Sequence, residues 1–437
     1  MPDIDVAIFD FISKLSTIEF KPTQHHPDLK GNDPVIDLGE AKNFGIEQVD
    51  PNDGSIISKY VDVNGKLTGL DEKGFVELKL LVSGLLASEP FASLADTEFL
   101  VNESFAWVIS VYKNQKADSS LTAHLITILN SQASNHRFYF RVEPLEIENA
   151  FSIGDIEFKF FCFDDIQTLY EQYIVTHPDT TLERFREVCA NNFNRVNACI
   201  ETKGAFSRAE EDAMRKVELA VDVLKICSIS EAMQFKVQVF DLDYRLQRKM
   251  PSYFLTHASN DLSNLSTQIR NHGEVVPIRI TSQKLKELDS RGLPKFASFI
   301  QHPKHNQLYD EIIGLIHQLG TIISTPDNYE KVVKAISLIE SILVPKDVGK
   351  AMGQTRLKLV IPQLATIQNE QELLLKIAPV FYNIRDRYLH NYRKLPINIE
   401  HLMFLLNFER VFILRLVKLN ATLSSIEEVH NYFGLKS

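Results

Sequence analysis

The last third of the chain carries a succession of apolar stripes at helical spacing, and this feature constrains the fold more than any other. From about Gln301 onward, hydrophobic residues recur every three or four positions, as in helices that bury one face. Five such stripes follow one another, over residues 312–323, 332–343, 359–367, 373–388 and 399–416. Because helices joined by short links pack side by side, the sequence predicts an antiparallel helical bundle over 301–437.

The first two thirds of the chain show a different periodicity. Apolar and polar residues alternate in three early segments, over residues 76–82, 138–142 and 156–162. Such alternation is typical of strands with one face on a core, and it predicts a β-rich domain over 1–165. Residues 166–300 mix the patterns, because 214–224 steps as a helix whereas 233–239 and 275–280 alternate as strands.

The expected fold class is therefore α+β. A β-rich or mixed N-terminal portion precedes an all-α C-terminal bundle, and region 166–300 is either separate from 1–165 or continuous with it. Charge follows a similar division. Residues 301–437 hold 16 Lys and Arg against 13 Asp and Glu, whereas the whole chain holds 47 against 57. A local nucleic-acid footprint at the C-terminal end is thus compatible with the charge distribution.

Cysteine usage and hydropathy bear on the compartment. Four cysteines show no CxxC spacing, which argues against a zinc module or a disulfide framework and favours the cytoplasm; they are Cys162, Cys189, Cys199 and Cys227. The most apolar helical stretch, 403–419, is interrupted by Glu409, Arg410 and Arg415. Charges at these positions make a membrane crossing costly, so no membrane association is expected.

Metal-dependent chemistry has only weak candidates. Asp28 with Glu40 and Lys42 superficially copies the acidic-plus-lysine pattern of metal-dependent nucleases. Asp241 and Asp243 flank one residue at the end of an expected strand and could reach a metal from one face, although a solvated strand end is the favoured interpretation. No phosphate-binding glycine loop or HExxH pattern occurs. No metal site and no cofactor are therefore predicted.

Segment 381–394 holds the strongest candidate for chemistry. Arg385 is followed directly by Asp386, and His390 comes five positions after the arginine. An arginine is a permanent forked phosphate binder, and a histidine transfers protons near neutral pH without a metal. Three further cations stand close by and are candidate RNA-binding residues: Arg387, Arg393 and Lys394. An exposed helix end whose cations complement the helix dipole is the ordinary alternative.

Helix geometry restricts how the candidate pair could act. Five residues at 100° each place the two side chains about 140° apart on an ideal helix. One unbroken helix would therefore not direct both Arg385 and His390 at one phosphate. Either the helix deforms after Arg385, or two protomers pool their residues in a shared cleft.

The segment resembles the signature of the HEPN superfamily, in which an arginine and a following polar residue precede a histidine by a few positions. Arg385, Asp386 and His390 match that signature. Region 338–391 is similar to the Apea-like HEPN branch, where a leucine-rich helix leads through Phe-Tyr-Asn-Ile, here 381–384, into the arginine. The resemblance covers about the last third of the chain.

The resemblance implies a helical bundle that homodimerises and acts as a metal-independent endoribonuclease on RNA, as a toxin or a phage-defence effector. His390 would transfer the proton, Arg385 would bind the phosphate and Asp386 would hold Arg385. Tyr392 extends the match to toxins whose tyrosine is modified by a nucleotidyltransferase antitoxin. The N-terminal portion would then regulate, sense a trigger or bind a partner protein. The alternative is a non-catalytic HEPN module that only dimerises or binds nucleotide or RNA.

Overall fold

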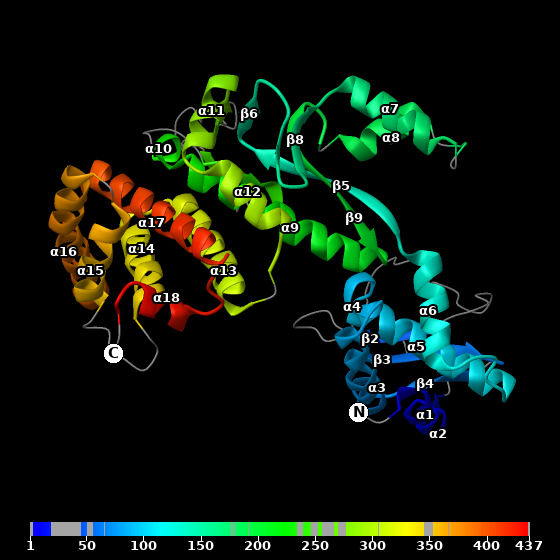
Figure 1. Ribbon diagram of the computed structural model, residues 1–437. Helices are drawn as coiled ribbons and strands as arrows, with labels where there is room; N and C mark the ends of the chain where they lie inside the picture. Colours follow the sequence, from blue (N-terminus) through cyan, green and yellow to red (C-terminus); the bar gives the residue numbers. More distant parts are fainter. Residues whose placement is uncertain are drawn as a thin grey trace. The chain divides into compact units, whose positions relative to one another are not determined.

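The computed structural model describes residues 3–18, 45–49, 56–64, 66–175, 178–179, 181–190, 192–233, 239–245, 252–255, 266–269, 277–304, 306–344, 353–365 and 367–435. The chain forms two compact units (Figure 1). Unit 1 comprises residues 1–136 and 202–212, and unit 2 comprises 137–201 and 213–437. The chain thus passes between the units within β5 (Ser134–Glu143), β9 (Arg195–Gly204) and α9 (Phe206–Cys227).

Unit 1 is built on a four-stranded sheet in the order β1-β4-β3-β2, with antiparallel neighbours. Its strands are β1 (Ser16–Ile18), β2 (Gly45–Val49), β3 (Ile56–Val63) and β4 (Lys66–Leu70). Its helices are α1 (Ile4–Ala7), α2 (Asp10–Lys14), α3 (Glu72–Ser83), the 3-10 helix η2 (Gly84–Ala87), α4 (Phe91–Leu94), α5 (Thr97–Asn114) and α6 (Leu121–Gln132). Leu70, Leu78 and Leu100 are fully buried in its core.

The strand predicted over 76–82 is wrong, because this segment lies in helix α3. The Asp71 side chain caps the helix by accepting a hydrogen bond from the Gly74 N–H at 2.9 Å. Phe75, Leu78 and Val82 are buried at helical spacing, whereas Leu80 is 72% exposed. A segment this rich in apolar residues satisfies both periods, and packing against α5 decides between them.

Unit 2 begins with a five-stranded sheet in the order β10-β5-β9-β8-β7. It comprises β5, β7 (Phe151–Ile153), β8 (Ile156–Phe161), β9 and β10 (Asp241–Leu242). Two small pairs accompany it: β6 (Leu145–Ile147) is parallel to β13 (Ile278–Ile280), and β11 (Ser252–Leu255) is antiparallel to β12 (Ser266–Ile269). The strands predicted over 138–142 and 156–162 are confirmed in β5 and β8. Part of the alternation predicted over 233–239 lies outside the described residues.

The helices of unit 2 are α7 (Phe163–Tyr173), α8 (Leu182–Cys189), α9, α10 (Ile229–Ala232), the 3-10 helix η3 (Asp243–Arg245), α11 (Ser282–Ser290), α12 (Leu293–Gln301), α13 (Gln307–Ser324), α14 (Asn328–Leu343), α15 (Gly353–Leu364), α16 (Gln368–Asn391), α17 (Ile399–Leu419) and α18 (Ile426–Tyr432). Within the described residues after 281, every element is a helix. Four of the five predicted stripes lie in α13, α14, α16 and α17, whereas the stripe predicted over 359–367 extends beyond α15, which ends at Leu364. Asn398 caps α17 through a bond from the His401 N–H. The α+β fold class is thus confirmed.

One hydrophobic core runs through all of unit 2. It joins Val142 of β5 and Phe158 of β8 to Leu224 of α9, Ile316 of α13 and Phe412 of α17, each of which is fully buried. The helices after Gln301 therefore share their core with the strands instead of enclosing a core of their own. This sharing bears on experiments, because removing residues 137–300 would expose the inner face of the bundle to water.

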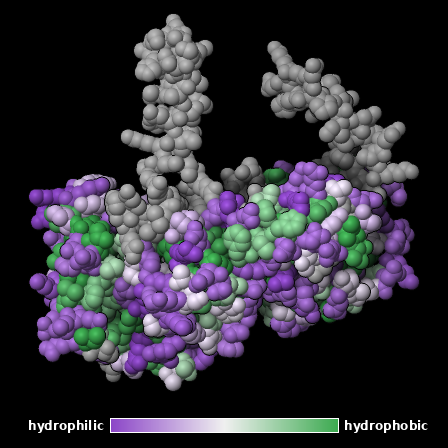
Figure 2. Space-filling view, turned by 90° about the horizontal axis from the view of Figure 1, so that it is seen from above, coloured by the Kyte–Doolittle hydropathy of each residue, from purple (hydrophilic) through white to green (hydrophobic). Residues whose placement is uncertain are grey.

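Hydrophobic and hydrophilic residues are mixed on the surface. Figure 2 shows one face on which hydrophobic residues are interspersed with hydrophilic ones. Scattered exposed apolar side chains of this kind are ordinary for folded proteins. Among the residues that the structure describes, no helix combines the length and the apolar character that crossing a membrane requires.

Candidate functional site

Helix α16 positions the arginine and histidine of the candidate motif. Its inner face buries Leu374, Ile377, Phe381 and Ile384, at steps of three or four residues. This face packs against α14 and α15. The helix continues through Pro379 and ends at Asn391, so the whole motif from arginine to histidine lies on one helix.

Arg385 is held at the side of α16 by an acidic residue of a neighbouring helix. Its Nη1 lies 2.7 Å from Glu340 Oε1 of α14, and the two side chains are 13% and 12% exposed. Its Nε donates to Asp386 Oδ1 at 3.0 Å. Burial acts to lower the pKa of Arg385, but the Glu340 and Asp386 carboxylates together outweigh burial and raise this pKa above its usual value. The guanidinium is therefore a fixed positive charge with a defined orientation.

Two further residues complete the surroundings of Arg385. The guanidinium carbon lies 4.9 Å from the centroid of the Tyr382 ring. Burial, and then the negative charge of Glu340, raise the pKa of the Tyr382 hydroxyl, which stays protonated. A Cβ added to Gly353 of α15 would lie 2.9 Å from Glu340 Oε1 and 3.0 Å from Tyr382 Oη. Glycine at this position thus leaves the room that Glu340 needs to reach Arg385.

His390 lies elsewhere on the same helix. It is exposed, in the last turn of α16, whereas Arg385 is largely buried. Since α16 is continuous between them, the two side chains point about 140° apart and are separated by about 7.5 Å along the axis. Of the two arrangements left open by the sequence, deformation of the helix after Arg385 does not occur. Within one chain, the structure does not bring the pair together.

The other predicted residues cluster where α16 ends. Arg387, Arg393 and Lys394 are exposed. Tyr392 is 84% exposed and adopts the left-handed conformation, with φ 50°. Lys394 Nζ lies 3.9 Å from Asp327 Oδ2, at the N-cap of α14. The structure therefore places cations on either side of the helix end.

The sequence did not predict the residues of other helices that contact Arg385 and Tyr388. Glu340 precedes Arg385 by 45 positions, and Tyr329 precedes Tyr388 by 59 positions. The Tyr329 and Tyr388 rings stack with centroids 5.4 Å apart. Glu340 is the only acidic residue in the α14 stripe after its first turn, and that isolation is the signal that could have singled it out.

At Asp241, the weak candidate for a metal site, cationic side chains contact the carboxylate. Asp241 Oδ2 lies 2.6 Å from Lys225 Nζ, which also lies 3.1 Å from Asp222 Oδ1. Arg245 and His317 contact Asp222 as well, at 3.3 Å and 2.7 Å. Asp241 is 6% exposed, so the expectation of a solvated strand end is wrong for this residue. Burial of this carboxylate is tolerated because the Lys225 ammonium neutralises its charge.

No metal-binding cluster is found in the described part of the chain. Asp243 contacts Arg141, and no group of three His, Cys, Asp or Glu side chains there could hold an ion. Asp28, Glu40 and Lys42 lie outside the described residues.

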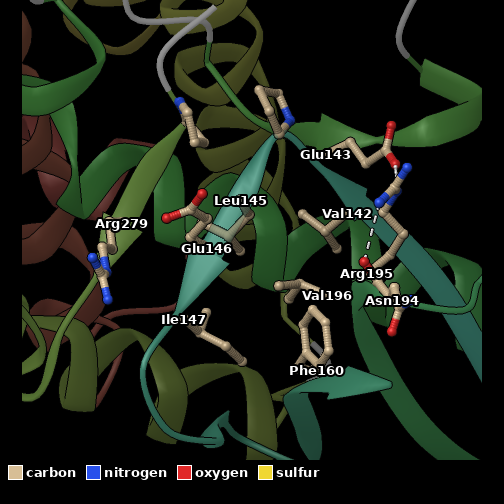
Figure 3. A pocket seen from close by; sticks show the side chains of 12 residues that line it. Val142, Glu143, Leu145, Glu146, Ile147, Phe160, Asn194, Arg195, Val196 and Arg279 are labelled. Carbon is tan, nitrogen blue, oxygen red and sulfur yellow. Dashed lines mark hydrogen bonds and ion pairs between the residues drawn. The ribbon is translucent and has the colours of Figure 1, made fainter. Parts of the chain in front are cut away.

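A pocket of about 510 Å³ lies among the strands of unit 2 (Figure 3). Arg195 Nε contacts Glu143 Oε1 at 2.8 Å on its wall. Arg279 of β13 stands opposite Glu146 of β6 in the parallel register. Acid and base thus face one another on both sides of the pocket, which leaves little net charge for an ionic ligand. None of the motif residues of α16 lines it.

Comparison with known proteins adds no relative: no protein-family model, curated protein or solved structure matches the chain. The HEPN resemblance accordingly rests on the residues of segment 338–392 alone.

Proposed function

We propose that this chain is a metal-independent endoribonuclease of the HEPN type. The observation that carries the proposal is the arrangement at the end of α16. There an oriented, ion-paired Arg385 is followed by an exposed His390 and by three exposed cations. Phosphate binding, proton transfer and attraction of a polyanion are the three elements that RNA cleavage without a metal requires.

The proposed reaction uses the RNA's own 2′-hydroxyl. Its oxygen attacks the adjacent phosphorus, the bond from phosphorus to the 5′-oxygen breaks, and a 2′,3′-cyclic phosphate remains. One base removes the 2′-hydroxyl proton, and one acid protonates the leaving 5′-oxygen. His390 would perform one of these transfers. Arg385 would neutralise the charge that develops on the phosphoryl oxygens, and Asp386 would keep its guanidinium oriented.

A homodimer would supply what one chain lacks. Because α16 directs its own Arg385 and His390 apart, a shared cleft has to combine residues of two protomers. Beside His390, the last turn of α16 carries an apolar side chain that a partner could cover, since Leu389 is 51% exposed. We therefore propose dimerisation through this side of the bundle, with a second histidine available for the second proton transfer.

A toxin or phage-defence role follows from the resemblance. RNA cleavage by such an effector has to be restrained, and the N-terminal portion would provide regulation or sensing. An antitoxin or a trigger protein is the corresponding partner. Tyr392 is the proposed modification site, and its 84% exposure makes its hydroxyl accessible to a modifying enzyme. The cytoplasm, where RNA is abundant, is the proposed location.

The test uses the purified full chain with mixed RNA in EDTA. We expect cleavage that leaves 2′,3′-cyclic phosphate ends, and we expect His390→Ala to abolish it without changing the melting temperature. His302→Ala is the matched control, because His302 is also exposed at the C-terminal end of a helix, α12, in the same unit. Equal cleavage by wild type and His390→Ala would refute the proposal.

One observation favours a second candidate. The ion pair between Arg385 and Glu340 occupies part of the guanidinium, and His390 faces elsewhere. A non-catalytic HEPN module that dimerises or binds RNA or nucleotide would need neither residue to approach a phosphate. RNA binding without any cleavage, in wild type and His390→Ala alike, would favour this alternative.

A further inference from the structure

Three tyrosine rings form a continuous series at the end of α16. Tyr329, in the first turn of α14, stacks on Tyr388 with an interplanar angle of 18° and centroids 5.4 Å apart. Tyr388 in turn meets Tyr392 edge to face at 6.5 Å. The Tyr329 hydroxyl donates to the Leu395 carbonyl at 2.8 Å. This bond ties the segment after α16 to α14, so the series is built on two helices and is not a chance contact along one.

The ring of Tyr392 is exposed, and the backbone of this residue adopts an unfavourable conformation. Tyr392 is the most exposed of the large hydrophobic residues in the described part of the chain, and it buries little surface in return for its position. It occupies the left-handed conformation at the helix C-cap, a position where glycine is favoured and a bulky residue is strained. The Tyr392 backbone N–H donates to the Tyr388 carbonyl at 3.0 Å and so caps the helix, but this bond does not need an aromatic side chain. An exposed aromatic ring that neither the core nor the cap requires suggests a role in binding.

Cations surround the tyrosine series. Lys394 Nζ lies 5.2 Å from the centroid of Tyr329. Arg387 and Arg393 flank Tyr392 in the sequence, and both are exposed. The acidic residues at hand, Asp327 and Asp386, contact Lys394 and Arg385 respectively, so Arg387 and Arg393 remain to attract a polyanion.

We propose that Tyr392, backed by Tyr388 and Tyr329, is a stacking platform for the bases of single-stranded RNA. Every base has an aromatic face, and stacking on a protein ring is tolerant of sequence. The faces are accessible only where the RNA is unpaired, since a duplex hides them between neighbouring bases. The cations would bind the backbone while the ring of Tyr392 receives a base. This inference rests on the proposed ribonuclease function and names its substrate class as single-stranded.

The experiment measures binding apart from cleavage. A fluorescein-labelled 12-nucleotide RNA with 2′-O-methyl groups lacks the attacking hydroxyl and stays intact. Its affinity for the full chain is measured by anisotropy, alone and annealed to its complement. We expect tighter binding of the single strand. We expect Tyr392→Ala to weaken this binding about tenfold, a typical effect of losing one base stack, and Tyr392→Phe to restore it.

Two controls separate stacking from charge and from folding. Tyr432→Ala is matched to Tyr392→Ala, because Tyr432 is 45% exposed with the Arg415 guanidinium 5.4 Å from its ring centroid, on α18. It should leave the affinity unchanged. Lys394→Ala should reduce the slope of log affinity against log salt by about one, whereas Tyr392→Ala should lower the affinity at every salt concentration and leave the slope intact.

The outcomes distinguish this inference from the proposed function. Unchanged affinity in Tyr392→Ala, or equal affinity for single and double strands, would overturn the platform even if the chain cleaves RNA. Weakened binding in Tyr392→Ala that Tyr392→Phe restores would support the platform even if no cleavage occurs in EDTA, in which case only the ribonuclease proposal fails.

Discussion

Glu409 offers a sharp test of how the core of unit 2 is built. This residue of α17 is completely buried, and neither carboxyl oxygen has a hydrogen-bond partner within the described residues. Burial therefore raises the pKa of Glu409 well above its usual value. A methionine has nearly the same length and no polar group to desolvate, so Glu409→Met should stabilise the fold.

The expected magnitude depends on pH. An unpaired polar group in a core costs about 1–3 kcal/mol even when neutral, and Glu409→Met should gain about this much at low pH. Because the folded-state pKa lies above the unfolded value of about 4.3, the folded chain holds the proton more tightly. The contribution of Glu409 to stability is thus highest below the unfolded pKa. It falls as pH rises toward the folded pKa, by up to about 1.4 kcal/mol per pH unit.

The assay compares urea unfolding of wild type, Glu409→Met and Glu409→Gln at pH 5 and pH 8. Circular dichroism follows the helices, and the single tryptophan, Trp107 in α5, reports on unit 1. Differences between variants cancel the titration of other groups. Glu409→Gln retains a buried polar group and has no charge, so its advantage over wild type should grow between pH 5 and pH 8.

Two results would refute this reasoning. If Glu409→Met is less stable than wild type, the carboxyl makes favourable contacts that its burial does not suggest. If Glu409→Gln keeps the same difference from wild type at both pH values, the folded-state pKa of Glu409 is not raised.

Three further predictions concern other parts of the chain. Gly353→Ala should crowd Glu340 and lower the free energy of unfolding by about 1–3 kcal/mol. We expect a lower melting temperature and weaker RNA cleavage, and a variant as stable and active as wild type would contradict the role of this contact. Lys225→Met leaves two buried carboxylates without their shared cation and should cost about 3–5 kcal/mol in urea unfolding, whereas no loss would mean that water reaches them. Burial raises the pKa of Cys199 and of Cys227 to about 12, so neither thiol should react with a disulfide reagent at pH 8 until urea is added. Fast reaction of all four thiols in the native chain would contradict the burial of these two.

Local periodicity accounts for the parts of the fold that the sequence predicts. Helices α13, α14, α16 and α17 each repeat one pattern over many residues, and burial on one face enforces that pattern. In β8 the alternation breaks at the end of the strand, where Phe160 is exposed and Phe161 is buried. The prediction for segment 76–82 is wrong, because its apolar residues fit both the helical and the strand period and only contact with α5 selects the helix. Residue chemistry likewise singled out Arg385 and His390, whose catalytic roles stay predictions.

Contacts between distant segments were decided by the tertiary structure alone. The pairing of Arg385 with Glu340, the stacking of Tyr388 on Tyr329 and the closeness of Gly353 all join residues that are far apart in the chain. Periodicity reports which face of a helix is buried, but not which neighbour covers that face or at what height along the axis. Those choices depend on how α14, α15 and α16 pack together in the close-packed core of unit 2.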